Sequence, residues 1–294
     1  MATGSKMLRL ATRGSAQATA QATAVADALM ASHAGLTVEL VFVETLGDQR
    51  ADVPLHTIGG QGVFVKEVQR AVLQGDADLA AHSAKDLPSA ASDGLQLAAF
   101  CERRDPRDAL IGAALADLPQ GATVATGSVR RRAQLTAVRP DLQFRELRGN
   151  IHTRLLKLPE GGALVMAVAA LQILELTDRI AQHLPVEAFV PSPGQGCVAV
   201  ECRTDDDEVA ELLAAIDHPA SRAAVELERA FLAELGSGCS LPVGAYAIEG
   251  LLTGFLADPA TDLHVTKSVT VQGGRGEQLQ QAEELARSLQ AELG

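Results

Sequence analysis

The sequence predicts an α/β fold of two similar lobes followed by a smaller α+β domain, and three observations carry this prediction. The chain has 294 residues, which is long for one compact core. Short apolar runs alternate with helical patterns, a rhythm typical of βαβ units and mostly parallel sheets. Two stretches rich in charge or in Pro and Gly, 102–108 and 184–196, interrupt this rhythm where the chain is expected to cross between lobes.

The first lobe is expected to begin with a strand and an Ala-rich amphipathic helix, for which Ser15 is the predicted N-cap. Gly75 follows the second helix in the position where glycine often ends a helix. The elements predicted for this lobe are strands at 7–12, 37–45, 77–83 and 95–100 and helices at 16–33 and 63–75.

A similar rhythm resumes after the first crossing, and a strand at 197–203 is expected to carry the chain back to the first sheet. The other elements predicted beyond residue 108 are a strand at 122–127, a helix at 128–139, a buried run at 163–171, helices at 205–216 and 221–236, several strands, and a C-terminal helix at 276–293.

Composition excludes several classes of protein. The net charge of −12 and the aromatic content of 3%, with no Trp, disfavour general nucleic-acid binding and base stacking. No apolar run suits a secretory signal or a membrane span, so we expect a cytoplasmic protein without membrane partners. The four cysteines form no C-x-x-C pair and lack neighbouring His residues, so we expect neither a structural metal nor a disulfide framework.

Positive charge is concentrated between residues 126 and 157, where eight basic and two acidic residues give a local charge of +6. Seven of the eight are Arg, whose planar fork binds carboxylates in bidentate fashion. A solvated helix face is the alternative interpretation of Arg130–Arg132. However, Arg130 and Arg131 follow a strand-to-helix turn, and Arg148 and Arg154 flank a Gly-Asn turn. Such turns bind anions in open α/β sheets, so we favour a polyanionic small ligand between the lobes.

Two further segments stand at predicted strand ends. In HSAKDLP (82–88), the alternatives are a surface turn or a site into which Lys85 and Asp86 project. A carboxylate there can exchange a proton with a nitrogen and stabilise developing positive charge. In ATRGS (11–15), Arg13 and Ser15 suit an anion in the same way.

Two loops invite chemical interpretations. The loop GGQG (59–62) matches neither nucleotide-binding glycine pattern, so we expect it to act as a lid. Cys239 lies in GSGCSLP, where small neighbours favour an accessible thiol that can serve as a covalent attachment point. Cys101, Cys197 and Cys202 are instead expected to be buried and inert.

Together these segments resemble the porphobilinogen deaminase family, also called hydroxymethylbilane synthases. The matching blocks occur in the order of the family: LRLATRGS, GVFVKEVQRAVLQGDADLAAHSAKDLP, RRDPRDALI, TGSVRRRAQL, LRGNIHTRLLKL, PGQGCVAVECR and ERAFLAELGSGCSLPVGA. They extend from about residue 8 to residue 246, and seven blocks in order make the resemblance specific.

The resemblance implies two lobes like those of type II periplasmic binding proteins, at 7–101 with 197–217 and at 105–193, and a third domain at 219–294. It implies a transferase of haem biosynthesis that joins four porphobilinogen units head to tail, releases ammonia and frees hydroxymethylbilane by hydrolysis. It also implies a dipyrromethane cofactor held by a thioether to Cys239. Each pyrrole ring carries an acetate and a propionate, which explains why an acidic chain concentrates Arg in one region.

The resemblance also assigns roles to individual residues, among them catalysis to Asp86 and Arg148. The residues that it assigns to the cofactor are Cys239, Ser83, Lys85, Asp86, Thr126, Ser128, Arg130, Arg131 and Arg154. The residues that it assigns to the substrate are Arg13, Ser15, Gln21, Arg148, Arg154 and Gln195, the last in the hinge.

The sequence departs from the family pattern at two positions. Ile173 stands where many members have Arg, so one carboxylate contact is missing or supplied elsewhere, with Arg179 as the candidate. Gln61 stands where the lid often has Lys. The main alternative function is a non-catalytic anion-binding protein built on the same two lobes, which leaves Cys239 and Asp86 unexplained. A transcriptional sensor domain would need a helix-turn-helix module, whereas the N-terminus begins with a strand. By the resemblance we expect a monomer whose only partner is its small-molecule substrate.

Overall fold

The computed structural model describes residues 6–45, 65–236, 241–261 and 263–294. The chain divides into two compact units. One consists of Met1–Arg103 with Cys197–Ala223, and the other of Arg104–Gly196 with Ala224–Gly294. The chain therefore passes between the units at 103/104 and 196/197, inside or beside the two stretches that the sequence predicts as crossings, and again within a helix near residue 223.

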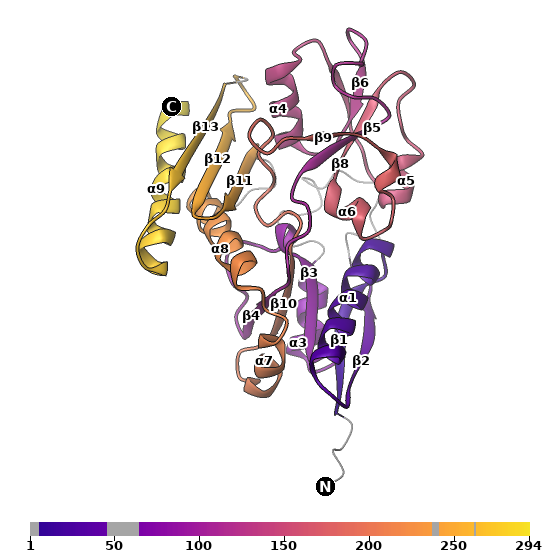
Figure 1. The fold of residues 1–294 in the computed structure, drawn as a ribbon, viewed down its shortest axis with the longest axis vertical. Coiled ribbons are helices and arrows are strands. Elements are labelled where there is room, and N and C mark those ends of the chain that lie inside the picture. Colours follow the sequence, from indigo (N-terminus) through magenta and orange to yellow (C-terminus); the bar gives the residue numbers. More distant parts are fainter. Residues whose placement is uncertain (1–5, 46–64, 237–240, 262) are drawn as a thin grey trace. The chain divides into compact units, whose positions relative to one another are not determined.

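The first unit is built on a five-stranded sheet of order β2-β1-β3-β10-β4 (Figure 1). Its strands are β1 (Lys6–Arg13), β2 (Leu36–Val43), β3 (Leu79–Ser83), β4 (Leu95–Phe100) and β10 (Val198–Arg203). β1 pairs in parallel with β2 and β3, whereas β10 is antiparallel to both β3 and β4. The prediction that 197–203 returns to the first sheet is therefore confirmed.

Helices cover both faces of this sheet, because its central strands are apolar on both sides. α1 (Ala16–Ser32) and α7 (Asp207–Ala214) contribute Leu29 and Leu213 to one core, and α3 (Lys66–Leu73) contributes Val72 to the other. Ser15 caps α1 as predicted, and Gly75 follows α3 with φ 79°, in the left-handed region that glycine adopts without strain.

The second lobe repeats this pattern with the sheet order β7-β6-β8-β5-β9. Its strands are β5 (Asp108–Ile111), β6 (Thr123–Ala125), β7 (Gln143–Arg145), β8 (Ala163–Ala167) and β9 (Ile180–Leu184). β5 is antiparallel to both β8 and β9 and follows the first crossing, as β10 follows the second. Each sheet thus receives its one antiparallel strand directly after the chain arrives from the other unit. Its helices are α4 (Val129–Val138), α5 (Ile151–Leu155) and α6 (Val168–Gln172).

Three strands of the second lobe are absent from the sequence-based elements. β5 begins at Asp108 within a charged segment, β7 has only three residues, and β9 alternates apolar with polar residues. The buried run 163–171 is not one element, since β8 ends at Ala167 and α6 starts at Val168. A continuous apolar run shows neither the two-residue period of a strand nor the 3.6-residue period of a helix, so it cannot reveal where one changes into the other.

The C-terminal part of the second unit is a small α+β domain. Its antiparallel sheet consists of β11 (Val243–Ile248), β12 (Leu251–Ala257) and β13 (His264–Thr270). α8 (Pro219–Glu234) and α9 (Arg275–Leu293) share one core with this sheet, and Figure 1 shows α9 running along β13 and β12. Gly254 lies under the ring of Phe231, where a Cβ atom would stand 2.6 Å from Cε2.

The other side of this small sheet packs on the second lobe through Val190, Phe255 and Ala257, with Ala133 and Tyr246 at the margin. The predicted fold class, two doubly wound α/β lobes and a smaller α+β domain, is therefore confirmed.

Candidate functional site

In the first unit, predicted substrate residues lie where β1 passes into α1. Arg13 is the last residue of β1 and is half-buried. Ser15 Oγ accepts a hydrogen bond from the backbone N–H of Ala18 at 3.3 Å, so this hydroxyl serves as the helix cap. Gln21, on the second turn of α1, donates from Nε2 to Ser83 Oγ at 3.0 Å. This bond brings α1 to the carboxyl end of β3.

The predicted catalytic carboxylate follows β3 directly. Residues Ala84–Asp86 form a short 3₁₀ helix that is anchored on both sides. The N–H of Ala84 donates to the carbonyl of Cys197 at 2.9 Å, and Leu87 is buried. Between these anchors Lys85 is half-buried and Asp86 is exposed. The local fold therefore presents the Asp86 carboxylate to the surface from a fixed stretch of backbone.

In the second lobe, hydroxyl side chains lie where β6 passes into α4. The N–H of Thr126 donates to the carbonyl of Arg145 at 2.9 Å, and Thr126 Oγ1 accepts from the N–H of Ser128 at 3.2 Å. Ser128 is the N-cap of α4, and its Oγ accepts from the N–H of Arg131 at 3.4 Å. These groups surround the positive end of the α4 dipole, a suitable place for an anion.

Arg130 and Arg131 share one buried carboxylate, that of Asp108. Arg130 Nη2 donates to Asp108 Oδ2 at 2.7 Å, and Arg131 donates to Oδ1 from Nη2 at 2.6 Å and from Nε at 3.0 Å. Each guanidinium also donates to a backbone carbonyl, that of Val190 for Arg130 and that of Val165 for Arg131. The exposed fraction of the side chain is 5% for Arg130 and 10% for Arg131.

Sequence reasoning missed Asp108, although it stands in the block RRDPRDALI. Burial raises the pKa of Asp108, but the positive charges of Arg130 and Arg131 and hydrogen bonds from Arg131 and Gln195 outweigh burial. The net result is a pKa far below the usual carboxyl range. Burial lowers the pKa of Arg130, which nevertheless stays far above neutral because guanidinium groups do not lose their proton in proteins. One carboxylate thus balances two guanidiniums, so these three side chains together carry a net charge of +1.

Gln195 belongs to the same cluster. Its side chain is buried, and Nε2 donates to Asp108 Oδ1 and to the carbonyl of Pro106, both at 2.8 Å. Next to it, Gly196 accepts at its carbonyl from the N–H of Arg104 at 2.9 Å. The two connecting segments of the chain, 104–108 and 191–196, are therefore bonded to each other beside the arginine pair.

The remaining predicted arginines flank α5. Arg148 Nε lies 3.6 Å from Glu146 Oε1, and Arg154 Nε donates to the carbonyl of Gly149 at 2.7 Å. Asn150 caps α5 by accepting from the N–H of Thr153. Both arginines are half-buried. These contacts hold the Nε atoms of both arginines close to the turn at residues 146–150, which the sequence places between them.

The structure thus brings the predicted residues into two groups, one in each unit. Cys239 and Gln61 lie outside the described residues. Ile173, which stands where the family often has Arg, is the C-cap of α6. Arg179, the suggested substitute, is exposed at the end of the 3₁₀ helix Thr177–Arg179.

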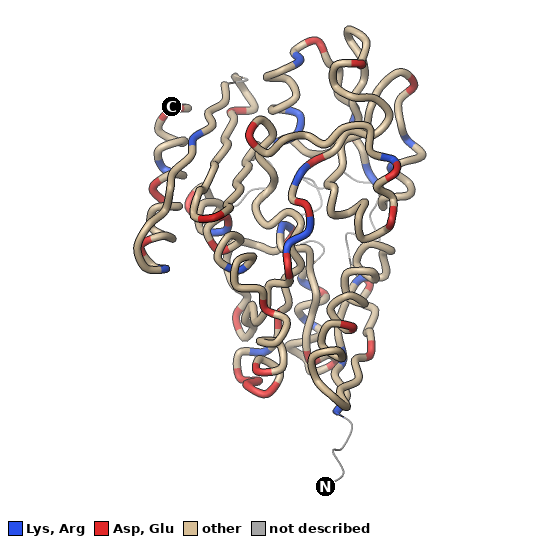
Figure 2. The backbone as a smooth tube through the Cα atoms, viewed as in Figure 1, with Lys and Arg blue, Asp and Glu red and all other residues tan. Residues whose placement is uncertain are grey.

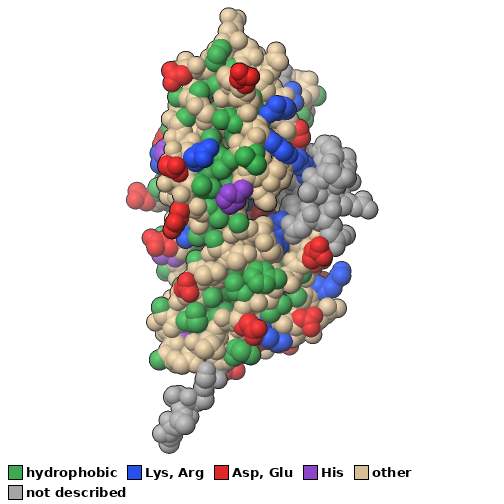
Figure 3. Space-filling model, turned by 90° about the vertical axis from the view of Figure 1, so that its right-hand side faces the viewer, with side chains coloured by type: hydrophobic (Ala, Val, Ile, Leu, Met, Phe, Trp, Pro, Cys, Tyr) green, Lys and Arg blue, Asp and Glu red, His purple; other side chains and the backbone are tan. Residues whose placement is uncertain are grey.

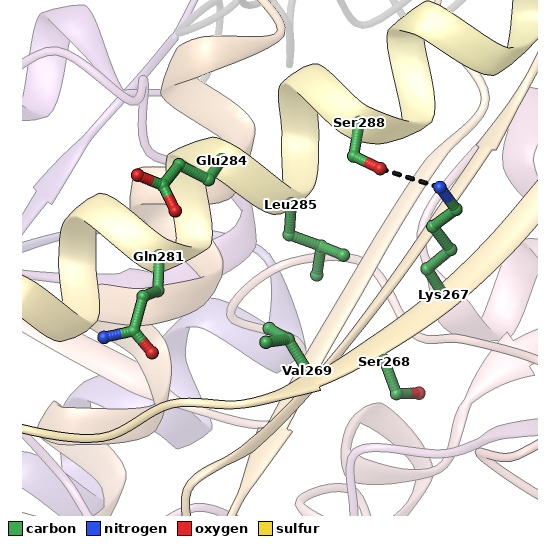
Figure 4. Close-up of a pocket in the computed structure, with 7 residues that line it drawn as sticks. All are labelled: Lys267, Ser268, Val269, Gln281, Glu284, Leu285 and Ser288. Atoms are coloured by element: carbon green, nitrogen blue, oxygen red, sulfur yellow. Dashed lines mark hydrogen bonds between the residues drawn. The ribbon is translucent and has the colours of Figure 1, made fainter.

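A separate hollow of about 390 Å³ lies between β13 and α9 in the C-terminal domain (Figure 4). Leu285 and Val269 face each other across it, and Lys267 Nζ donates to Ser288 Oγ at 2.7 Å at its margin. No residue predicted for the site lines this hollow. On the face drawn in Figure 3, acidic, basic and hydrophobic side chains are intermingled. No helix among the described residues has the length and apolar character to cross a membrane.

Paired α/β lobes that present guanidinium, hydroxyl and helix-end N–H groups at strand ends define a binder of small polyanions. The comparison with known families identifies the family to which this chain belongs. Residues 8–211 match the porphobilinogen deaminase dipyrromethane cofactor binding domain, and residues 222–294 match the porphobilinogen deaminase C-terminal domain. The chain belongs to the porphobilinogen deaminase family. It is a transferase of porphyrin biosynthesis with a dipyrromethane cofactor, and it makes hydroxymethylbilane from porphobilinogen.

Several solved structures are also similar to this chain. One is the methionine-binding protein MetQ, with 16% identity, 71% of this chain and 88% of that chain covered, and a TM-score of 0.45. Another is a nutrient-binding protein from Burkholderia cenocepacia bound to methionine, with 15% identity, 72% and 92% coverage and a TM-score of 0.44. A TRAP periplasmic solute-binding protein from Desulfovibrio salexigens has 12% identity, 73% coverage of each chain and a TM-score of 0.43.

The donor set of the described residues fits a dipyrromethane. The group carries several carboxylates, and the second lobe offers Thr126, Ser128 and Arg131 around one helix end, with one net positive charge after Asp108 is counted. Considered by itself, the first lobe offers the hydroxyl of Ser83 and the ammonium of Lys85 next to the exposed Asp86. These are the groups that bind carboxylates through charge-assisted hydrogen bonds.

Proposed function

We propose that this chain is a hydroxymethylbilane synthase in which Asp86 is the catalytic carboxylate. The observation that carries the proposal is the exposed Asp86 side chain on a 3₁₀ turn anchored by the Ala84–Cys197 hydrogen bond and by buried Leu87. A fixed backbone and an open side chain are what a group needs to act on a substrate without reorganising first.

Asp86 acts on the nitrogen atoms of the substrate. When porphobilinogen loses ammonia, positive charge develops at its pyrrole nitrogen. A carboxylate within hydrogen-bond reach stabilises that charge and takes up or returns the proton that must move. Lys85, the neighbouring cation in the same 3₁₀ helix, is proposed to bind an acetate or propionate of the same ring and so to orient it.

Binding of the cofactor falls to residues of both units. When bound, dipyrromethane supplies the primer on which the product is assembled. Cys239 would hold it covalently, and the other residues proposed to hold its carboxylates and ring nitrogens are Ser83, Lys85, Asp86, Thr126, Ser128, Arg130, Arg131 and Arg154. The described members of this set lie at strand ends or helix starts, as anion-binding residues of open α/β sheets commonly do.

Substrate binding and chain growth fall to a second set of residues, namely Arg13, Ser15, Gln21, Arg148, Arg154 and Gln195. Arg148 is proposed to neutralise the carboxylates of each added ring, which makes it catalytic for elongation rather than for the first bond. Its half-buried side chain and its 3.6 Å contact with Glu146 hold it beside the turn that precedes α5.

We infer a monomer in the cytoplasm, with porphobilinogen as its only small-molecule substrate. We also infer three domains, at 7–101 with 197–217, at 105–193 and at 219–294. The strands and helices of each range close on their own sheet, which supports these boundaries.

The direct test is turnover of porphobilinogen by the variant Asp86→Asn. We expect consumption of porphobilinogen to fall about 100- to 10,000-fold, the usual range for loss of acid-base and charge stabilisation. The matched control Asp93→Asn changes another exposed carboxylate of the first unit and should turn over normally. If Asp86→Asn retains the rate of the control, Asp86 is not the catalytic carboxylate.

A further inference from the structure

Asp108 is a buried carboxylate that accepts hydrogen bonds from three side chains of the second unit. It is the first residue of β5, only 1% of its side chain is exposed, and it was not among the residues expected from the sequence. Its partners are Arg130 and Arg131 on α4 and Gln195 on the second connecting segment. Figure 2 shows basic and acidic residues alternating along the segment from β4 to β5 that ends at this residue.

The first function of this carboxylate is to let two guanidiniums lie side by side. Adjacent buried positive charges repel strongly where the dielectric constant is low. Asp108 compensates them through three charge-assisted hydrogen bonds of 2.6–3.0 Å. A guanidinium has five N–H donors, so Arg131 can bind a ligand carboxylate while it remains bonded to Asp108.

The second function concerns the connecting segments. Asp108 Oδ1 accepts from Arg131 at 2.6 Å and from Gln195 at 2.8 Å, so these two donors share one oxygen atom. The other bond of Gln195 Nε2 goes to the carbonyl of Pro106. The backbones of the two segments also approach each other closely at Gly196, because a Cβ atom at this position would stand 2.7 Å from the carbonyl oxygen of Arg104. The ligand-binding arginine and the connecting segments thus meet at one atom.

We propose that Asp108 is a positioning residue that couples the charge bound at Arg131 to the hydrogen bonding of the two connecting segments. The inference rests on the proposed function, since it takes the carboxylates of the pyrrole chain as the ligand of Arg131. An anion that attracts Arg131 weakens its bond to Oδ1 and strengthens the bond from Gln195. Each addition of a ring with two carboxylates therefore changes how firmly segments 104–108 and 191–196 are joined.

Amide hydrogen exchange with and without porphobilinogen tests this coupling in the holoprotein. In the parent chain, adding porphobilinogen should change the exchange of peptides that cover 104–108 and 191–196. In Asp108→Asn that change should disappear, and kcat/KM should fall about 100-fold because Arg131 is displaced. The matched control Asp141→Asn removes a carboxylate that pairs with Arg139 in the same lobe, and both readouts should stay as in the parent chain.

A second variant keeps the test decisive if Asp108→Asn does not fold. Gln195→Leu keeps the carboxylate that binds Arg130 and Arg131 and removes the side-chain bonds from Gln195 to Asp108 and to the carbonyl of Pro106. We expect this variant to carry the cofactor by intact mass and to lose the exchange response to porphobilinogen. An unchanged exchange response in either folded variant overturns the coupling. By contrast, a parent chain that neither carries an adduct nor consumes porphobilinogen contradicts the proposed function itself.

Discussion

Replacing Glu228 with Gln tests how the C-terminal domain is fastened to the second connecting segment. Glu228 lies on α8 and is fully buried. Its Oε2 accepts from the N–H of Gly194 at 2.7 Å, and its Oε1 accepts from the N–H of Ala247 on β11 at 2.8 Å. One carboxylate therefore joins three segments that are distant in the sequence.

The magnitude follows from the change of one oxygen to an amino group. Glu228→Gln keeps the shape of the side chain but replaces one acceptor oxygen with an NH₂ group. This group is itself a donor, so the backbone N–H that faces it loses its acceptor. The loss of a charge-assisted hydrogen bond costs about 1.5–3 kcal/mol, and the backbone N–H left without a partner costs about 1–3 kcal/mol more. Together these two contributions should lower the free energy of unfolding by about 2.5–6 kcal/mol.

The assay is denaturation by urea or heat, with Glu226→Gln as the matched control on the same helix. Glu226 pairs with Arg275, whose side chain is 69% exposed, so this pair is expected to contribute at most about 1 kcal/mol. The prediction requires Glu228→Gln to be clearly less stable than the control. If the two variants unfold at the same urea concentration or the same temperature, the buried carboxylate does not hold the domain as described.

Three further predictions concern stability and reactivity. Gly254→Ala should destabilise the C-terminal domain by about 1–3 kcal/mol, because the new Cβ atom would overlap the ring of Phe231; unchanged denaturation would contradict this packing. Burial raises the pKa of Asp78, but hydrogen bonds from Arg9 outweigh it and lower the pKa overall. The destabilisation caused by Asp78→Asn should thus be present at pH 7 and shrink as the pH falls below about 4, so a pH-independent difference would count against this pair. Burial raises the pKa of the Cys202 thiol to about 11. Iodoacetamide at pH 8 should therefore alkylate Cys202 only after unfolding, and rapid labelling of the native chain would show that the thiol is accessible.

Local signals in the sequence predicted local structure well. Ser15 stands before an Ala-rich helical pattern and caps α1, and Gly75 ends α3 with a positive φ. Both positions are set by interactions within a few residues. The doubly wound lobes were also predictable, since alternating strand and helix patterns permit few other arrangements. The three short strands of the second lobe were not, because pairing with distant neighbours rather than apolar pattern creates them.

The candidate site was likewise predictable from the sequence only in part. The concentration of Arg in one stretch of an acidic chain indicated an anionic ligand, and the family comparison agrees with it. The partner of Arg130 and Arg131 could not be found from pattern, because Asp108 is more than twenty positions away in a segment with charges of both signs. A sequence displays the excess of positive charge, but only the fold decides which carboxylate balances it.

The most direct test of the account is the intact mass of the purified chain, followed by peptide mapping. We expect a mass above that of the sequence by two deaminated porphobilinogen units, with the addition on the peptide that contains Cys239. The variant Cys239→Ser should lack the addition and should not convert porphobilinogen. A chain that turns over porphobilinogen at its unmodified mass, or that carries the addition on another residue, would contradict the account.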